Sequence, residues 1–486
     1  HFNVFAGKDR TRYFLAEYDA KAIRPHAMGK FRDLLGAVAK SPAMLYYLDN
    51  WQSVADSGRP TLGNERPLAQ ALRRRAAQRA NQNPAKAPVM MPGVAPLAGR
   101  KRGLNENYAR ELMELHTLGV DGGYTQNDVI EVARALTGWT LERGAQGGEF
   151  MFRAAAHDAG AKTILGKQFP AGRGVEEGEA VLDMLAAHPA TANYIATKLA
   201  RRFVSDTPPA ALVKRAAATF TRTKGDIRET MRTIVTSPEF FSTAAYRAKV
   251  KSPFELVVST LRAMNAAPDL TPRTTQLLTR LGQPLFGHQA PNGYPETGDA
   301  WMNTGSILNR INFGLAVAAN RIPNVRLQDW PATKTLATAS REQQVDGVIR
   351  ELLGGAASSD TREVLLTGTN PFLQARGGAS DTLLVDDSAD TGMMSGSMSG
   401  SMSGATAGAN SGNTMAGGDK AASRRQARRA AQAQQPGPRQ QAAAGKEAVK
   451  PGAGATLTQS IGNLPSITGF AQIVGLAIGA PEFQRR

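Results

Sequence analysis

The stretch that decides the fold is GLNENYARELMELHTLGVDGGYTQNDVIEVARALTGWT, residues 103–140. It concentrates polar side chains at helical spacing between two clear breaks. Gly119 supplies a helix C-terminal signal, and Thr125 with Asp128 forms a capping box that opens the next helix. We therefore predict two consecutive helices joined by the DGG turn, the second closing at Gly138.

The rest of the chain also favours helices over sheets. Ala and Leu are abundant and aromatic residues make up only 6% of the chain, and Ala and Leu lose little side-chain entropy in a helix. Residues 25–50 read as paired helices, the second with Ser41 as N-cap and Pro42 at its first position. We expect a mainly α, multi-helix globular domain with one small β-hairpin, formed by 150–152 and 163–165.

Composition divides the chain into three parts. Residues 1–375 form the predicted helical domain, which includes a long basic loop at 56–102. Residues 376–456 are rich in Met, Ser, Gly and Gln, and such chain buries too little apolar surface to offset its ordering entropy, so we predict a disordered insertion. Residues 457–486 carry a final apolar helix that we expect to pack back on the domain.

The formal charge of +17 belongs to the loops. Nine basic and no acidic residues lie in 66–105, and eight basic against two acidic residues lie in 419–450, which together account for 15 of the 17 charges. These tracts lack interleaved aromatic residues, so we expect no nucleic-acid binding. The absence of cysteine excludes disulfides and thiolate metal sites but leaves the compartment open. The longest apolar run, 467–480, is shorter than the roughly 20 residues that span a bilayer, so no transmembrane segment is expected.

The first site candidate is an arc of polar side chains on the helix after Gly103. At about 100° per residue, Asn107, Arg110, Glu111 and Glu114 fall on one side, bordering the core. Two carboxylates held by an amide and a guanidinium suit acid/base work or a hard cation. A solvated helix face with i,i+3 and i,i+4 pairs explains the same pattern.

The second site candidate is His157 with Asp158, followed by Lys162. A His-Asp pair can serve as a base with its orienting partner or as metal ligands, whereas Asp158 alone can make an Asx turn. His288 and Tyr294, in the irregular segment GQPLFGHQAPNGYPETGDAWMN (282–303), rank third. Nucleophile-elbow, Walker and dinucleotide motifs are missing from the sequence, and the metal, cofactor and oligomeric state stay open.

The 103–140 stretch strongly resembles the hallmark segment of the bacterial family catalogued as domain of unknown function 1800. The similarity extends to HFNVFAGKDR, FRAAAHDAGAKTILG, HPATANYIATKLARRFVSDTPP and the endings SPEF and APEFQRR. The positions that fall in family motifs are Asn105, Glu106, Asn107, Arg110, Glu111, Glu114, His116, His157, Asp158 and Lys162. The resemblance implies a further helical portion before His1, export to the periplasm or the extracellular space, and a sulfatase-like partner protein encoded nearby.

Two functional hypotheses follow. In the first, the protein is an exported hydrolase acting on a polymer or a cell-envelope substrate. Its acid/base groups are among Glu111, Glu114, His157 and Asp158, and Arg110 and Asn107 position them. In the second, it is a non-catalytic envelope scaffold or binding partner, in which the same residues form a buried polar network that fixes helix packing.

Overall fold

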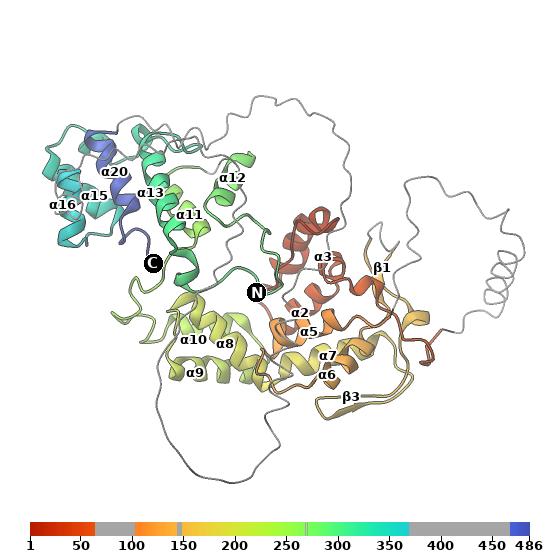
Figure 1. Ribbon diagram of the computed structural model, residues 1–486. Helices are drawn as coiled ribbons and strands as arrows, with labels where there is room; N and C mark the ends of the chain where they lie inside the picture. Colours follow the sequence, from red (N-terminus) through yellow and green to blue (C-terminus); the bar gives the residue numbers. More distant parts are fainter. Residues whose placement is uncertain (64–102, 143–147, 268, 270, 369–466) are drawn as a thin grey trace, which may run out of the picture. The chain divides into compact units, whose positions relative to one another are not determined.

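The computed structural model describes residues 1–63, 103–142, 148–267, 269, 271–368 and 467–486. Most of these residues are helical, which confirms the mainly α prediction (Figure 1). They belong to one unit of the chain, His1–Leu373 together with Thr458–Arg486. The predicted disordered insertion at 376–456 and most of the predicted basic loop at 56–102 lie outside the described residues.

The chain begins with short helices and continues into the segment that carries the first site candidate. In order, the elements are η1 (Thr11–Phe14), α1 (Leu15–Glu17), the π-helix η2 (Tyr18–Ile23), α2 (Phe31–Ala39), α3 (Pro42–Tyr47), η3 (Asn50–Gln52), α5 (Glu106–Glu111), the π-helix η6 (Leu112–Thr117) and α6 (Gln126–Ala135).

Helices also make up the second half. They are α7 (Val175–Ala187), α8 (Pro189–Phe203), α9 (Ala210–Arg222), α10 (Ile227–Val235), α11 (Pro253–Ala263), α12 (Pro272–Arg280), η9 (Gly298–Trp301), α13 (Thr304–Ala318), η10 (Leu327–Asp329), α14 (Thr333–Leu336), α15 (Arg341–Leu352), α16 (Ser359–Thr367) and α20 (Gly469–Gly479).

The helix boundaries follow the capping signals of the sequence. Ser41 caps α3 through the Ala43 N–H, with Pro42 at the first helical position. Thr125 and Asp128 exchange both bonds of the predicted capping box at the start of α6. Each such cap satisfies backbone N–H groups that have no partner within the helix. The local signals thus place these helix starts without tertiary information.

The strands differ from the predicted hairpin. Instead of pairing 150–152 with 163–165, the chain forms two antiparallel pairs. The strand β2 (Phe150–Phe152) pairs with β1 (Trp139–Leu141), and β3 (Lys162–Ile164) pairs with β4 (Lys167–Phe169). A short 3-10 helix, η8 (Ala154–Ala156), and a buried turn separate β2 from β3. Because β2 pairs with β1 and β3 pairs with β4, the two strands do not form a hairpin with each other.

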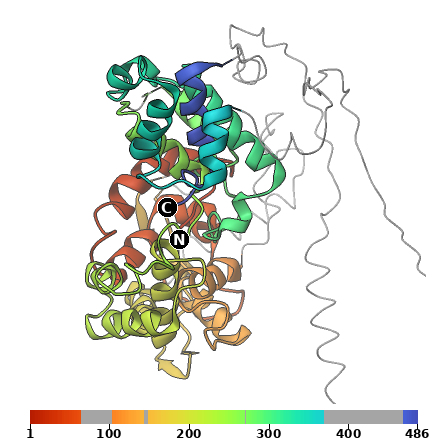
Figure 2. The same cartoon turned by 90° about the vertical axis from the view of Figure 1, so that its left-hand side faces the viewer.

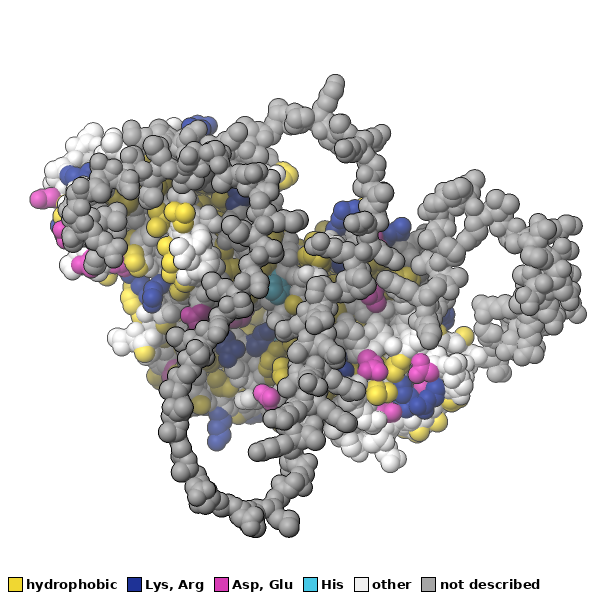
Figure 3. Space-filling model, viewed as in Figure 1, with side chains coloured by type: hydrophobic (Ala, Val, Ile, Leu, Met, Phe, Trp, Pro, Cys, Tyr) yellow, Lys and Arg dark blue, Asp and Glu magenta, His cyan; other side chains and the backbone are white. Residues whose placement is uncertain are grey.

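Two large apolar cores stabilise the unit. The first is built by α2, α3, α5 to α7 and the strands, and the second by α11 to α16 and α20. Helix α20 lies against α13, α15 and α16, as Figure 2 shows for the blue C-terminal segment. Figure 3 shows that hydrophobic side chains also remain exposed over α13, where Leu308 is 56% exposed.

The close approach of α13 and α20 requires glycine. A Cβ built on Gly314 would lie 2.5 Å from the Gly475 carbonyl oxygen, a backbone atom that cannot move aside. We expect Gly314→Ala to lower the free energy of unfolding by about 1–3 kcal/mol. Urea denaturation followed by circular dichroism measures the effect. Gly305→Ala in the same helix is the control, since its nearest neighbour would be 3.6 Å away. Equal stability of the two variants would contradict this packing.

Candidate functional site

Helix α5 and the π-helix η6 carry the first site candidate. Asn105 caps α5, because its Oδ1 accepts a hydrogen bond from the Tyr108 N–H. Beyond α5 the backbone widens into a π-helix, in which the Leu118 N–H donates to the Met113 carbonyl five residues earlier, at 2.7 Å. Single π-turns occur frequently at functional sites. The spacing of about 100° per residue that predicted the polar arc therefore applies to Asn107, Arg110 and Glu111 on α5, but not to Glu114 on η6.

Glu111 and Glu114 are both partly exposed and differ in their partners. Tyr124 Oη donates to Glu114 Oε2 at 3.1 Å, whereas Glu111 makes no hydrogen bond or ion pair with another described residue. Burial raises the pKa of Glu111 above its ordinary value, and the charge of Glu114 raises it further, while Arg110 opposes the rise. Burial and the charge of Glu111 together raise the pKa of Tyr47 to about 12.

The predicted positioning residues do not contact the two carboxylates. Arg110 Nη2 donates to Gln126 Oε1 at 2.7 Å and lies 3.9 Å from a Glu106 carboxylate oxygen. Asn107 is exposed, and it makes no hydrogen bond with the residues that the structure describes. Arg110 therefore acts on Glu111 through its electric field alone.

His116 is buried at the end of η6. Its Nε2 has no hydrogen-bond partner in the described part of the chain, and burial lowers its pKa to about 3. The ring packs against Phe2, with the ring centroids 5.1 Å apart. Gly119 follows in the left-handed conformation, with φ +84°, as its predicted role in ending the helix requires. His116 is thus a neutral core residue and not a partner of the carboxylates.

The second site candidate lies in a closed network of charges. Arg134 on α6 binds both oxygens of Asp158, through Nε at 2.8 Å and Nη2 at 3.1 Å, and its Nη1 binds Glu131 at 2.7 Å. His157 and Asp158 are fully buried, with 0% and 1% exposure. Lys162 donates to the Asp158 carbonyl at 2.7 Å. All these polar side chains are therefore engaged with other parts of the protein.

Glu177 on α7 completes the network. Lys162 Nζ lies 2.7 Å and His157 Nε2 3.3 Å from Glu177 Oε2. The short lysine contact is an ion pair without hydrogen-bond geometry, since Nζ directs its N–H groups to backbone carbonyls. His157 Nδ1 lies 2.8 Å from the Thr137 carbonyl and must carry a proton, because a carbonyl can only accept. Burial pushes the pKa of Asp158 upward, but hydrogen bonds led by that from Arg134 hold it below its ordinary value.

The structure keeps the two candidates apart. No hydrogen bond or ion pair between described residues joins Glu111 or Glu114 to His157 or Asp158. Helix α6 contacts α5 on the one hand and β3 on the other. The predicted four-residue acid/base set is thus divided into a partly exposed carboxylate pair and a closed charge network.

The irregular segment 282–303 lies on the side of the carboxylate pair. Tyr47, whose pKa responds to Glu111, donates from Oη to the Gln289 carbonyl at 2.6 Å. Asn3 binds the neighbouring His288 carbonyl at 2.9 Å. Sequence reasoning ranked this segment third and missed Tyr47, Tyr124 and Glu177. The only available signal was the abundance of Pro and Gly in the segment, which is typical of an ordered functional loop.

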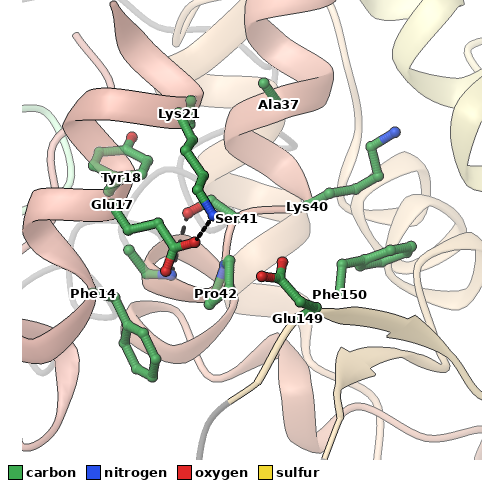
Figure 4. Close-up of a pocket in the computed structure, with 12 residues that line it drawn as sticks. Phe14, Glu17, Tyr18, Lys21, Ala37, Lys40, Ser41, Pro42, Glu149 and Phe150 are labelled. Carbon is green, nitrogen blue, oxygen red and sulfur yellow. Dashed lines mark hydrogen bonds and ion pairs between the residues drawn. The ribbon is translucent and has the colours of Figure 1, made fainter.

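A cavity of about 340 Å³ opens beside η2, between Phe14, Lys40 and Glu149 (Figure 4). Its two lysines already have partners, since Lys21 pairs with Glu17 and Lys40 lies 2.9 Å from Glu179. The cavity therefore offers no free lysine to a ligand.

Neither a cluster of metal ligands nor a membrane-spanning helix occurs in the described residues. Within these residues, His, Asp and Glu side chains nowhere gather in a group of three that could hold a metal ion. In the same part of the chain, no helix has both the length and the apolar composition needed to cross a bilayer.

Comparison with known proteins gives a family but no activity. A family model described as "Protein of unknown function (DUF1800)" matches residues 1–485. No curated protein and no solved structure matches the chain. A function must therefore be argued from the residues of the chain itself.

The closed network predicts a large stability effect. Lys162→Met leaves Glu177 buried beside a histidine alone, and we expect a loss of about 3–5 kcal/mol in the free energy of unfolding. Urea denaturation measures it. Arg362→Met, which breaks the exposed pair with Asp346, is the control and should cost at most about 1 kcal/mol. A similar small cost for Lys162→Met would show that the network is not closed to water.

The environment of Glu111 predicts an unusual pH dependence. The pKa of Glu111 is higher in the folded protein than in the unfolded chain, so ionisation of Glu111 disfavours folding. The free energy of unfolding therefore falls as the pH rises from the unfolded pKa of Glu111 through its folded pKa. Glu111→Gln should therefore stabilise the protein at neutral pH, and the gain should vanish in acid. Thermal denaturation at several pH values tests this, and Glu114→Gln should lower the Glu111 pKa in carboxyl-carbon NMR titrations. An unchanged Glu111 pKa in that variant would refute the coupling.

Proposed function

The chain belongs to the DUF1800 family of proteins of unknown function, and we propose that it is a hydrolase in which Glu111 and Glu114 form the acid/base pair. The observation that carries the proposal is the unequal environment of the two carboxylates. Glu111 has a raised pKa and no counter-ion among the described residues, whereas Glu114 accepts a hydrogen bond from Tyr124. Two carboxylates in different environments can divide the roles of acid and base between them.

The reaction follows from these roles. Glu111, protonated, donates its proton to the leaving-group oxygen as the scissile bond breaks. Glu114, ionised, takes a proton from the water whose oxygen forms the new bond. The charge of Glu114 raises the pKa of Glu111, so the two carboxylates lie close enough to act on one substrate. Proton exchange with solvent then restores the starting state.

A polymer or cell-envelope substrate suits the surroundings of the pair. Tyr124, which is partly exposed beside Glu114, offers a flat apolar ring with a polar tip, which suits ligands with both apolar and hydroxyl-bearing faces. Both carboxylates are partly exposed, so a long chain can reach them without entering a closed cavity. Export of the protein, which the family resemblance implies, would place it beside such substrates.

A non-catalytic scaffold is the second candidate, and the closed network around Glu177 favours it. His157, Asp158 and Lys162 are all engaged in holding α6, β3 and α7 together. In this alternative a sulfatase-like protein is the partner, and the carboxylate pair is part of the binding surface. Loss of binding without any hydrolytic activity would identify this function.

Substitution of each carboxylate separates the two functions. Against a panel of dye-labelled polysaccharides, peptidoglycan and aryl esters, we expect Glu111→Gln and Glu114→Gln each to lower kcat/KM by about 10²–10⁴-fold. Glu111→Gln should remove the alkaline limb of the pH profile, because the raised pKa of Glu111 is what keeps the acid protonated. Glu106→Gln, on the same helix and hydrogen-bonded to Gln126, is the matched control and should stay active. Equal activity of all three variants would exclude the pair from catalysis.

A further inference from the structure

A second cavity, of about 440 Å³, lies between η2, α2 and α8 and is closed on one side by the 282–303 segment. Its size is within the range of roughly 300–1,000 Å³ that small-molecule sites occupy. The walls are mostly apolar and include Ile23, Phe31, Leu34, Ile195, Ile227 and Phe286. Such walls suit a hydrocarbon group rather than a polar one.

One cation at this cavity has no counter-ion. Lys198 on α8 makes no hydrogen bond or ion pair with the described residues, and its Nζ lies 5.6 Å from the centre of the Tyr194 ring. Burial lowers the pKa of Lys198, an effect that the charge of Glu296 opposes. An ammonium in this position loses water without gaining a protein partner, so an anion bound beside it would restore the lost interaction.

The other charged side chains of the cavity are already paired. Asp19 binds Arg24 at 2.5 Å. Arg202 lies 2.8 Å from Glu255 and 3.4 Å from Glu296. Because Asp19 pairs with Arg24, and Glu296 pairs with Arg202, Lys198 is the charged side chain of the cavity that remains to recognise a ligand.

We propose that this cavity binds a single alkyl chain with an anionic head group, the chain lying against the apolar walls and the head group meeting Lys198. The unpaired Lys198 ammonium favours a negative charge on the head group of the ligand, and the apolar walls favour its alkyl chain. The site uses neither Glu111 nor Glu114, so it stands independently of the proposed hydrolysis.

Calorimetric titration of the full chain with dodecanoate, below its micelle concentration, tests the proposal. We expect saturable one-to-one binding, and Lys198→Met should weaken it by about 10-fold or more, as loss of a charge-assisted bond requires. Dodecyltrimethylammonium, with the same chain and the opposite charge, should bind at least about 10-fold more weakly than dodecanoate. Lys214→Met removes an exposed lysine from the neighbouring helix α9 and should change nothing.

A second variant tests the hydrocarbon half of the site. Ala27 is an exposed residue that lines the cavity, and Ala27→Trp should block the chain and weaken dodecanoate binding without unfolding the protein. Lys198→Met should also raise Tm, because it removes an unpaired, partly desolvated charge. Equal affinity of the two head groups, or unchanged dodecanoate affinity in Lys198→Met, would overturn the proposal. So would the absence of dodecanoate binding to the unaltered chain.

Discussion

The structure around the candidate site depends on the buried contact of Lys162 and His157 with Glu177. It joins a β-strand and a turn to the helix α7, and Arg134 extends it to α6 through Asp158. The carboxylates of Glu131, Asp158 and Glu177, the basic side chains of Arg134 and Lys162, and the ring of His157 therefore lie together with little access to water. Such groups cost free energy to bury unless each meets a partner of opposite charge. The arrangement is consequently intolerant of a shift in any one element and fixes how α6 and α7 pack.

The fixed packing of α6 and α7 also determines the position of the neighbouring helix α5 and its side chains. Helix α6 also packs against α5, and Gln126 at its start links to Glu106 and Arg110. With α5 held in this way, the π-turn of η6 carries Glu114 toward Tyr124. Glu111 is left without a counter-ion among the described residues, an arrangement that raises its pKa and costs stability at neutral pH. The closed network is thus buried and paired, whereas the carboxylate pair is partly exposed, although both are clusters of polar residues in the sequence.

The 282–303 segment connects the pair to the second cavity. Its Gln289 carbonyl binds Tyr47 beside Glu111, and its Phe286 and Glu296 line the cavity that holds Lys198. Irregular chain can serve two neighbouring sites because its backbone groups are satisfied by side chains from several elements. The proposed anion site and the proposed acid/base pair therefore share one loop while using different charged groups.

The sequence by itself determined the helical class, the caps at Ser41 and Thr125, the turn at Gly119 and the location of a dense polar segment at 103–118. These features depend on interactions within a few residues, which a sequence displays directly. Tertiary structure decided the pairing of β2 with β1, the burial of His157 and Asp158, and the separation of both from Glu111 and Glu114. Tertiary structure also placed Glu177 beside Lys162, Tyr47 beside the Gln289 carbonyl and Lys198 in the second cavity. The physical reason is that burial and ion pairing join side chains far apart in the chain, and helical spacing carries no information about which distant group will face them.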